Sequence, residues 1–233
     1  AKQLLGRTYD VARPGVVAIY LTGSLPAGCG PHDVAIALVG KLFKSGYVKN
    51  KVMEFVGPGI ASLRQDTRNA IDAMTTETTC LSSIWETDET THRFLAVHGR
   101  AADYKKLAPA DLAYYDGVVE VDLSAIRPMI ALPMHPSNAF TIEELNANLE
   151  DILHACEQDV QKLIGRKDVS LDLCSKIENG KLRVDQGVIA GCAGGLYDSI
   201  YEAASILKGH TGGCGDYALS VYPGSQPIMM ELV

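Results

Sequence analysis

The order of hydrophobic and polar positions along the chain predicts strands that alternate with helices. Val16–Leu21 (VVAIYL) is an unbroken apolar run, typical of a strand that is buried on both faces. Three further strands are expected at Lys51–Val56, Cys80–Trp85 and Val118–Leu123. Helices are expected between them, at Asp33–Phe43, Ser62–Met74 and Thr87–Val97. This alternation predicts an α/β fold with a mainly parallel sheet.

A proline-rich segment from Arg127 to Asn138 is the best boundary between two parts of the chain. We therefore divide the chain into residues 1–130 and 131–233. After the boundary, Thr141 and Glu144 have the spacing of a capping box, which predicts the start of one long helix that runs to Leu163. The elements expected next are a hairpin over Leu171–Ile177 and Lys181–Val184, a strand at Val188–Ala190, a helix at Tyr197–Leu207 and a strand at Tyr217–Tyr222.

Composition and charge narrow the class of protein. Of 233 residues, 47% are hydrophobic and 21% are charged, which is typical of a globular chain and not of a disordered one. The net charge of -7 argues against a nucleic-acid partner, because phosphate backbones attract basic surfaces. The apolar runs are too short to cross a bilayer, so no membrane partner is expected. The six cysteines form no C-x-x-C pair, and their thin spread favours a reducing cytoplasm.

The most informative local pattern is a glycine-rich turn that contains Cys192. Gly187–Gly195 (GVIAGCAGG) ends a predicted strand and precedes a helix. A cysteine near a helix N-terminus is favoured as thiolate, which suits a metal or cluster ligand or a nucleophile. The alternative from the residues alone is a small side chain that fills a crowded turn. The six histidines lack the H-x-x-x-H spacing of metal ligands, and none is predicted to bind a metal.

A second pattern places a carboxylate among hydroxyl groups. Glu77 lies in Met74–Cys80 (MTTETTC), between a predicted helix and the next strand. This carboxylate is either a ligand contact or part of a solvated helix end. Gly57-Pro58-Gly59 is expected to be a structural turn rather than an anion cradle.

Several of these segments resemble, in the same order, motifs of the aconitase family. They are Val17–Val39, which contains Asp33-Val34, Glu54–Gly59 (EFVGPG), Met74–Glu77 (MTTE), Ser83–Asp88, Gly187–Cys192 (GVIAGC) and Tyr222–Ser225 (YPGS). His32 replaces the lysine that usually precedes the family's Asp-Val. The sequences of Cys80–Trp85 and Pro133–Thr141 are most similar to those of the divergent bacterial hydratase branch of the family.

The resemblance implies a fold, a reaction and a cofactor. Residues 1–130 would form an aconitase-like second domain, a three-layer α/β unit, and residues 131–233 the first part of the third domain. The longer parent would dehydrate and rehydrate a hydroxy di- or tricarboxylic acid, with a [4Fe-4S] cluster as cofactor. Cys192 would be one of three cluster ligands, and the other two would lie outside this chain. Glu77 would be a catalytic residue near the iron-bound oxygen, in the same cleft as Cys192.

As a fragment, the chain itself is expected to be inactive and to bind no intact cluster, and the missing domains would be its partners. Two other functions stay open at this point. A divergent branch of the family would have exchanged catalysis for a binding or regulatory role, or the chain would be a metal-free α/β module that binds a small molecule.

Overall fold

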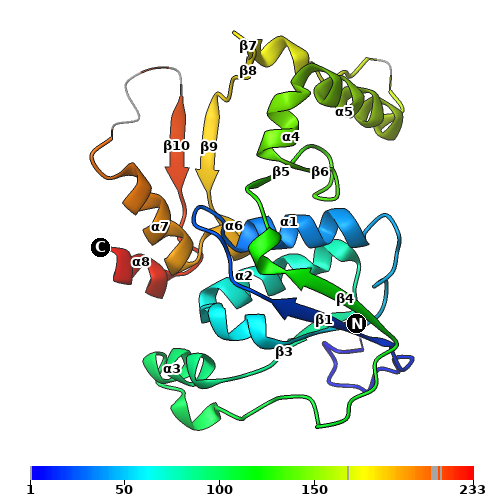
Figure 1. Cartoon of the computed structure of the whole chain (residues 1–233), viewed down its shortest axis with the longest axis vertical. Helices are drawn as coiled ribbons and strands as arrows, with labels where there is room; N and C mark the ends of the chain where they lie inside the picture. Colours follow the sequence, from blue (N-terminus) through cyan, green and yellow to red (C-terminus); the bar gives the residue numbers. More distant parts are fainter. Residues whose placement is uncertain (1, 167, 211–214, 216) are drawn as a thin grey trace.

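The first part of the chain is built on a four-stranded parallel sheet (Figure 1). The computed structural model describes residues 2–166, 168–210, 215 and 217–233. The strand order is β3-β2-β1-β4, with β1 at Val16–Thr22, β2 at Val52–Val56, β3 at Ser82–Trp85 and β4 at Gly117–Asp122. All three pairings are parallel. The predicted α/β fold with a mainly parallel sheet is therefore confirmed.

Two helices cover one face of this sheet. They are α1 (Pro31–Leu42) and α2 (Gln65–Met74), and their apolar residues Leu38 and Ile71 join the core formed by Ile19 and Phe55. The other face is more open, because Tyr20 of β1 is exposed. The prediction that β1 is buried on both faces is therefore wrong at Tyr20. Side chains alternate across a strand, so the apolar run reports burial of one face and leaves the other undecided.

The remaining elements of the first part are short. The helix α3 (Glu89–Val97) lies apart from the sheet, at the bottom of Figure 1, and contributes no buried residue. Its N-terminus is capped by Asp88, whose carboxylate accepts the N–H groups of Thr90 and Thr91 at 2.9 and 3.3 Å. The 3₁₀ helices are η1 (Pro58–Ser62), η2 (Thr75–Thr78), η3 (Ala101–Asp103) and η4 (Leu123–Ala125). The helix predicted from Ser62 therefore begins only at Gln65, after η1.

The second part has its own hydrophobic cluster, which includes Leu132, Leu145 and Leu153. Its elements are β5 (Met129–Ala131), β6 (Ala139–Thr141), α4 (Ile142–Ala147), α5 (Leu149–Ile164), η5 (Cys174–Lys176), β7 (Ile177–Glu178) and β8 (Lys181–Leu182). The two clusters change over between Ile126 and Leu132. The division of the chain into domains at residue 130 stays a prediction.

The predicted long helix is in fact two helices. The capping box is confirmed, since the Glu144 N–H donates to Thr141 Oγ1 at 3.0 Å and the Thr141 N–H donates to Glu144 Oε2 at 2.8 Å. However, Asn148 has φ -134° and ψ 41°, so the helix stops there and α5 begins at Leu149. Apolar residues keep their helical spacing across the break, because both helices bury the same cluster. Periodicity therefore hides the break, while asparagine, a weak helix former, permits it.

The last part of the chain is a pair of parallel strands with three helices. These are β9 (Gln186–Ile189), β10 (Ala218–Val221), α6 (Gly191–Gly194), α7 (Tyr197–Leu207) and α8 (Gln226–Leu232).

The predicted hairpin, formed by β7 and β8, exists but is shorter than expected. Asn179 and Gly180 have φ 53° and 73°, as a tight type I′ turn requires. Within the described residues, no helix has the length and hydrophobicity needed to cross a membrane.

Candidate functional site

The turn after β9 presents Cys192 to solvent. Gly191 has φ +87°, a left-handed conformation that favours glycine, and it opens the short helix α6. Within α6, Cys192 is exposed and Ala193 is buried. The cysteine side chain therefore does not fill the turn; that place belongs to Ala193. The thiol follows the carboxyl end of β9, which is the edge where parallel sheets of α/β folds generally bind ligands.

The turn that follows β10 packs against the Cys192 turn. Gly224, in the segment after β10, donates its N–H to the carbonyl of Gly195 at 2.8 Å. A β-carbon on Gly195 would lie 2.7 Å from the Gly191 carbonyl oxygen and 2.8 Å from the Gly224 nitrogen. Only glycine permits that approach. The GCAGG and PGS segments are therefore parts of one local structure.

Ion pairs join helix α7 to the N-terminal end of α2. Arg64, the residue before α2, lies with its Nε 3.2 Å from Asp198 of α7 and also pairs with Glu202. The N–H of Asp198 donates to Asp66 at 3.3 Å. Burial raises the pKa of Asp198, and the Arg64 charge partly opposes that shift. The Cys192 turn is thereby held near the N-terminal end of α2.

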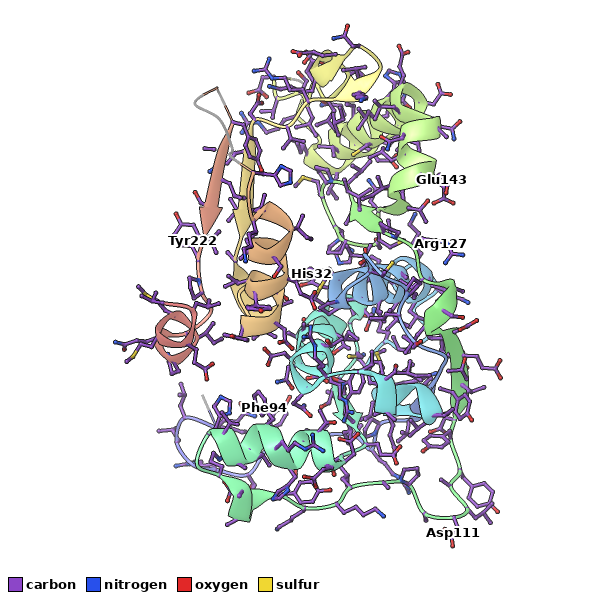
Figure 2. All side chains as sticks on the ribbon, turned by 60° about the vertical axis from the view of Figure 1, so that its left-hand side comes forward. His32, Phe94, Asp111, Arg127, Glu143 and Tyr222 are labelled. Carbon is purple, nitrogen blue, oxygen red and sulfur yellow. The ribbon has the colours of Figure 1, made fainter. Side chains whose placement is uncertain are left out.

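His32 is the residue of this region that spacing did not single out. It lies at the start of α1, between α1 and α7 (Figure 2), and lines a cavity of about 290 Å³ together with Ala190, Gly194 and Ser199. A β-carbon built on Gly194 would lie 3.7 Å from the imidazole. Burial lowers the pKa of His32, with Asp33 acting against it, so the ring is neutral near pH 7. The sequence feature that could have pointed to His32 is its position directly before the family motif Asp33-Val34.

Glu77 lies in a different place. Its carboxylate, in η2, is 3.7 Å from Nε2 of His135, which comes from the loop between β5 and β6. The His135 ring stacks on Phe43 with ring centroids 3.9 Å apart. Phe43 directly follows the C-terminal end of α1. Glu77 therefore bridges the two parts of the chain and is about half exposed.

The structure does not bring Glu77 and Cys192 together. His32 marks the N-terminal end of α1 and Phe43 its C-terminal end, roughly 16 Å apart at the rise of an α-helix. The Cys192 turn lies beside the first and Glu77 beside the second. The expectation that both residues open onto one cleft does not fit this arrangement. Their roles in the reaction stay predictions.

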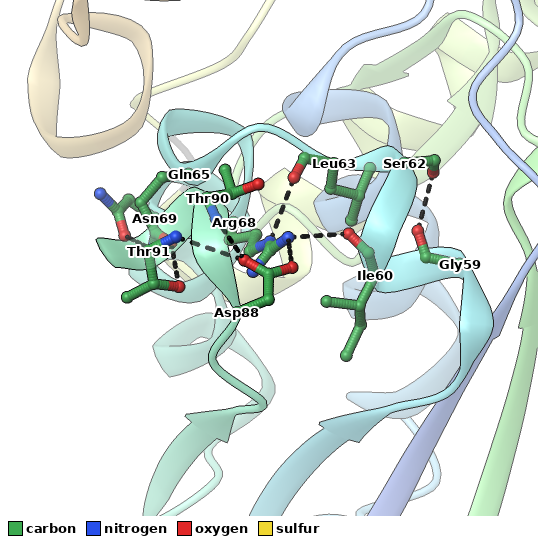
Figure 3. Close-up of polar contacts among 10 residues, drawn as sticks. All are labelled: Gly59, Ile60, Ser62, Leu63, Gln65, Arg68, Asn69, Asp88, Thr90 and Thr91. Atoms are coloured by element: carbon green, nitrogen blue, oxygen red, sulfur yellow. Dashed lines mark hydrogen bonds and ion pairs between the residues drawn. The ribbon is translucent and has the colours of Figure 1, made fainter. Parts of the chain in front are cut away.

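A buried arginine holds the loop that carries Gly57-Pro58-Gly59 (Figure 3). The Arg68 side chain is 1% exposed and donates to the carbonyls of Leu63 and Ile60 at 3.1 and 3.0 Å and to Asp88 at 2.6 Å. Partial burial alone would raise the pKa of Asp88, but the Arg68 contact and the α3 N–H groups lower it below its usual value. The same loop needs glycine, because a β-carbon on Gly59 would lie 2.8 Å from the backbone of Leu21. Gly57-Pro58-Gly59 thus belongs to a loop that hydrogen bonds from Arg68 hold against the start of α2.

The donor set can be compared with the needs of an iron–sulfur cluster. The described cysteines Cys29, Cys80, Cys156, Cys174 and Cys192 all have free thiols, and Cys214 lies outside the described residues. Within the described ranges, just one group of three or more His, Cys, Asp or Glu side chains is close enough to hold a metal, and it contains one sulfur, that of Cys174. Cys192 therefore fits one exposed sulfur ligand, while these residues do not assemble three.

Comparison with known proteins relates the chain to one family. A family model described as "Aconitase family (aconitate hydratase)" matches residues 1–233. The 3-isopropylmalate dehydratase large subunit of Thermoanaerobacter sp. is 30% identical over 94% of this chain and 44% of its own length. The corresponding subunit of Lachnoclostridium phytofermentans is 26% identical over 94% of the chain and 44% of its own length. The 2,3-dimethylmalate dehydratase large subunit of Eubacterium barkeri is 28% identical over 84% and 38%, respectively. The chain thus spans less than half the length of these relatives.

Proposed function

Because the chain belongs to the aconitase family, we propose that it is part of a hydro-lyase that removes water from a small hydroxy di- or tricarboxylic acid and adds it back. The relatives include dehydratase large subunits, which confirms the predicted likeness to the bacterial hydratase branch. The observation that carries the proposal is the exposed Cys192 thiol within a family match over the whole chain. The names of the relatives favour a substituted malate as substrate and a second subunit as partner.

The proposed cofactor is a [4Fe-4S] cluster, with Cys192 as one ligand and two further thiolates from the rest of a longer protein. When bound, such a cluster supplies an iron atom with an open position that acts as a Lewis acid. Residues of this chain hold the Cys192 turn and line the cavity beside it. The Gly195–Gly224 contact holds the Cys192 turn, and the neutral His32 ring is a hydrogen-bond partner for a carboxylate or hydroxyl group in the adjoining cavity. The ion pairs of Arg64 with Asp198 and Glu202 hold α7 against the N-terminal end of α2.

The first test compares this chain with a longer protein that contains it and the remaining family segments. After anaerobic treatment with iron and sulfide, we expect the longer protein to retain a cluster and to hydrate a substituted maleate or aconitate. The 233-residue chain alone is expected to retain no cluster and to show no activity, because its described residues do not assemble three thiolates. A brown and active short chain would refute the inferred ligand set. A longer protein with neither iron nor activity would favour the binding or regulatory role.

From the family motif Met74–Glu77, and not from proximity to Cys192, we propose Glu77 as a catalytic carboxylate of the same reaction, and Glu77→Gln in the longer protein tests this role. Losing a general acid or base slows turnover by about 10²-fold or more, whereas the iron content should stay unchanged. The measurements are kcat, KM and iron per protein, with Glu120→Gln on the exposed side of β4 as the matched control. Should kcat stay constant while thermal stability falls, and His135→Ala show the same fall, then Glu77 only holds the His135 contact.

A further inference from the structure

A second group of metal-binding side chains lies in the second part of the chain, away from the Cys192 turn. His154 and Glu157 are one helical turn apart on α5, and Cys174 opens η5. One ligand atom from each of the three residues lies within 4.8 Å of the others. Nδ1 of His154 lies 3.6 Å from Oε2 of Glu157. Imidazole nitrogen, carboxylate oxygen and thiolate sulfur are the three donor types that zinc accepts.

Backbone hydrogen bonds fix the Glu157 side chain and the backbone of Cys174. Oε1 of Glu157 accepts the N–H groups of Leu173 and Cys174 at 2.5 and 2.8 Å, and the Glu157 side chain is 17% exposed. These bonds hold the start of η5 against α5 and leave Oε2 directed to His154. A carboxylate oriented by its other oxygen is the arrangement found around ligands in established metal sites.

The histidine is likewise oriented through its second nitrogen. Nε2 of His154 lies 2.9 Å from the side-chain amide of Gln158, which leaves Nδ1 facing Glu157. A metal-binding histidine usually donates its other ring N–H to an acceptor, and Gln158 supplies one when its side-chain amide is turned so that the oxygen, instead of the nitrogen, faces Nε2. The His154 side chain is 65% exposed, so it can move closer to its neighbours without disturbing the core.

The electrostatic surroundings favour a cation. The Cys174 thiol is near the carboxylates of Glu157, Glu150 and Asp172, and its sulfur is 3.8 Å from the carbonyl oxygen of Glu150. These negative groups attract a divalent ion, which binds cysteine as thiolate and neutralises it together with the nearby carboxylate.

We propose that His154, Glu157 and Cys174 form a binding site for a divalent metal ion of the zinc class. In a tetrahedral zinc site with ordinary bond lengths, the ligand atoms are roughly 3.3 to 3.6 Å apart. The observed spacing needs only a small contraction, which the exposed imidazole provides. The sulfur and nitrogen donors favour Zn²⁺ or Co²⁺ over Mg²⁺. Three protein ligands leave a fourth position for water, and the ion joins α5 to η5 across the intervening loop. The site shares no residue with the proposed cluster ligand.

Cobalt tests this site directly, because Co²⁺ bound by a thiolate has a visible spectrum and a sulfur charge-transfer band. We expect the reduced 233-residue chain to bind one Co²⁺ with that band, Zn²⁺ to displace it, and excess Mg²⁺ to leave it unchanged. Cys174→Ser should abolish the charge-transfer band. His154→Gln, at an exposed position, should weaken binding by about 10-fold or more. Glu157→Gln is a poor test, since it also disturbs the backbone contacts of η5.

The matched controls are Cys192→Ser, at an exposed thiol outside the site, and His98→Gln, at another exposed imidazole. Both variants should keep the cobalt band and its affinity. Zn²⁺ should also raise the Tm of the unaltered chain and of both controls, but not that of Cys174→Ser. The proposal is overturned by a band that survives Cys174→Ser, by one that depends on Cys192, or by the absence of any band. If Cys174→Ser fails to fold by circular dichroism, an affinity unchanged by His154→Gln overturns it equally.

Discussion

Replacing Cys192 with alanine in the longer protein should abolish hydratase activity and lower its iron content. The exposed thiol at the end of β9 is the residue that the family motif assigns to the cluster. With two thiolates left, the cluster would lose one of its three protein ligands, which lowers its retention. Iron and sulfide per protein, the visible absorption spectrum and the initial rate of hydration measure the outcome.

The control for this variant is Cys29→Ala, which removes a partly buried thiol that contacts the carbonyl of Ile126 at 3.7 Å. It should leave iron content and activity close to those of the unaltered protein. Full iron and full activity in Cys192→Ala would show that the family role does not transfer to this residue. The chain would then be an α/β binding module with an unassigned ligand.

Arg68→Met should be the most destabilising of the substitutions considered. Removing one partner of a fully buried ion pair costs about 3 to 5 kcal/mol, and the loss here should lie near the lower end of that range, because the Asp88 side chain left behind is 35% exposed. Here the variant strands the carbonyls of Ile60 and Leu63, while Asp88 loses its buried cation. Methionine retains part of the apolar stem, so the loss reports mainly the guanidinium. Urea unfolding of the 233-residue chain gives the free energy of unfolding.

Arg93→Met is the matched control, since Arg93 and its partner Glu89 are both exposed on α3. Exposed pairs of this kind contribute up to about 1 kcal/mol, so the control should unfold almost as the unaltered chain does. Equal losses in the two variants would mean that the Arg68 network adds nothing beyond a surface charge.

The pH dependence provides a second readout for the same network. The folded-state pKa of Asp88 is lowered, so its contribution to stability is present above the unfolded-state value of about 3.9 and is lost as the pH falls through the folded-state value. Arg68→Met removes the main charge that lowers this pKa. The variant should therefore lose less stability than the unaltered chain between neutral and acidic pH.

Much of the local structure could be predicted from the sequence alone. Alternating apolar runs and helical spacing identified the parallel strands and the helices α1, α2 and α7, because each element must bury one face. The Thr141–Glu144 spacing predicted the capping box, and the hairpin that joins Ile177 to Lys181 was also predicted, since both depend on neighbours in the chain. The same local logic located Cys192 at a strand-to-helix turn.

Only the tertiary structure decided which residues meet. The break at Asn148 left the apolar spacing intact, and the distance between Glu77 and the Cys192 turn follows from the ends of α1 that each adjoins. His32 reached the neighbourhood of Cys192 from a helix far away in the sequence. His154, Glu157 and Cys174 came together because the backbone N–H groups of Leu173 and Cys174 donate to the Glu157 carboxylate of α5. Periodicity states which face of an element is buried, but the partner of that face depends on the packing directions of the whole chain.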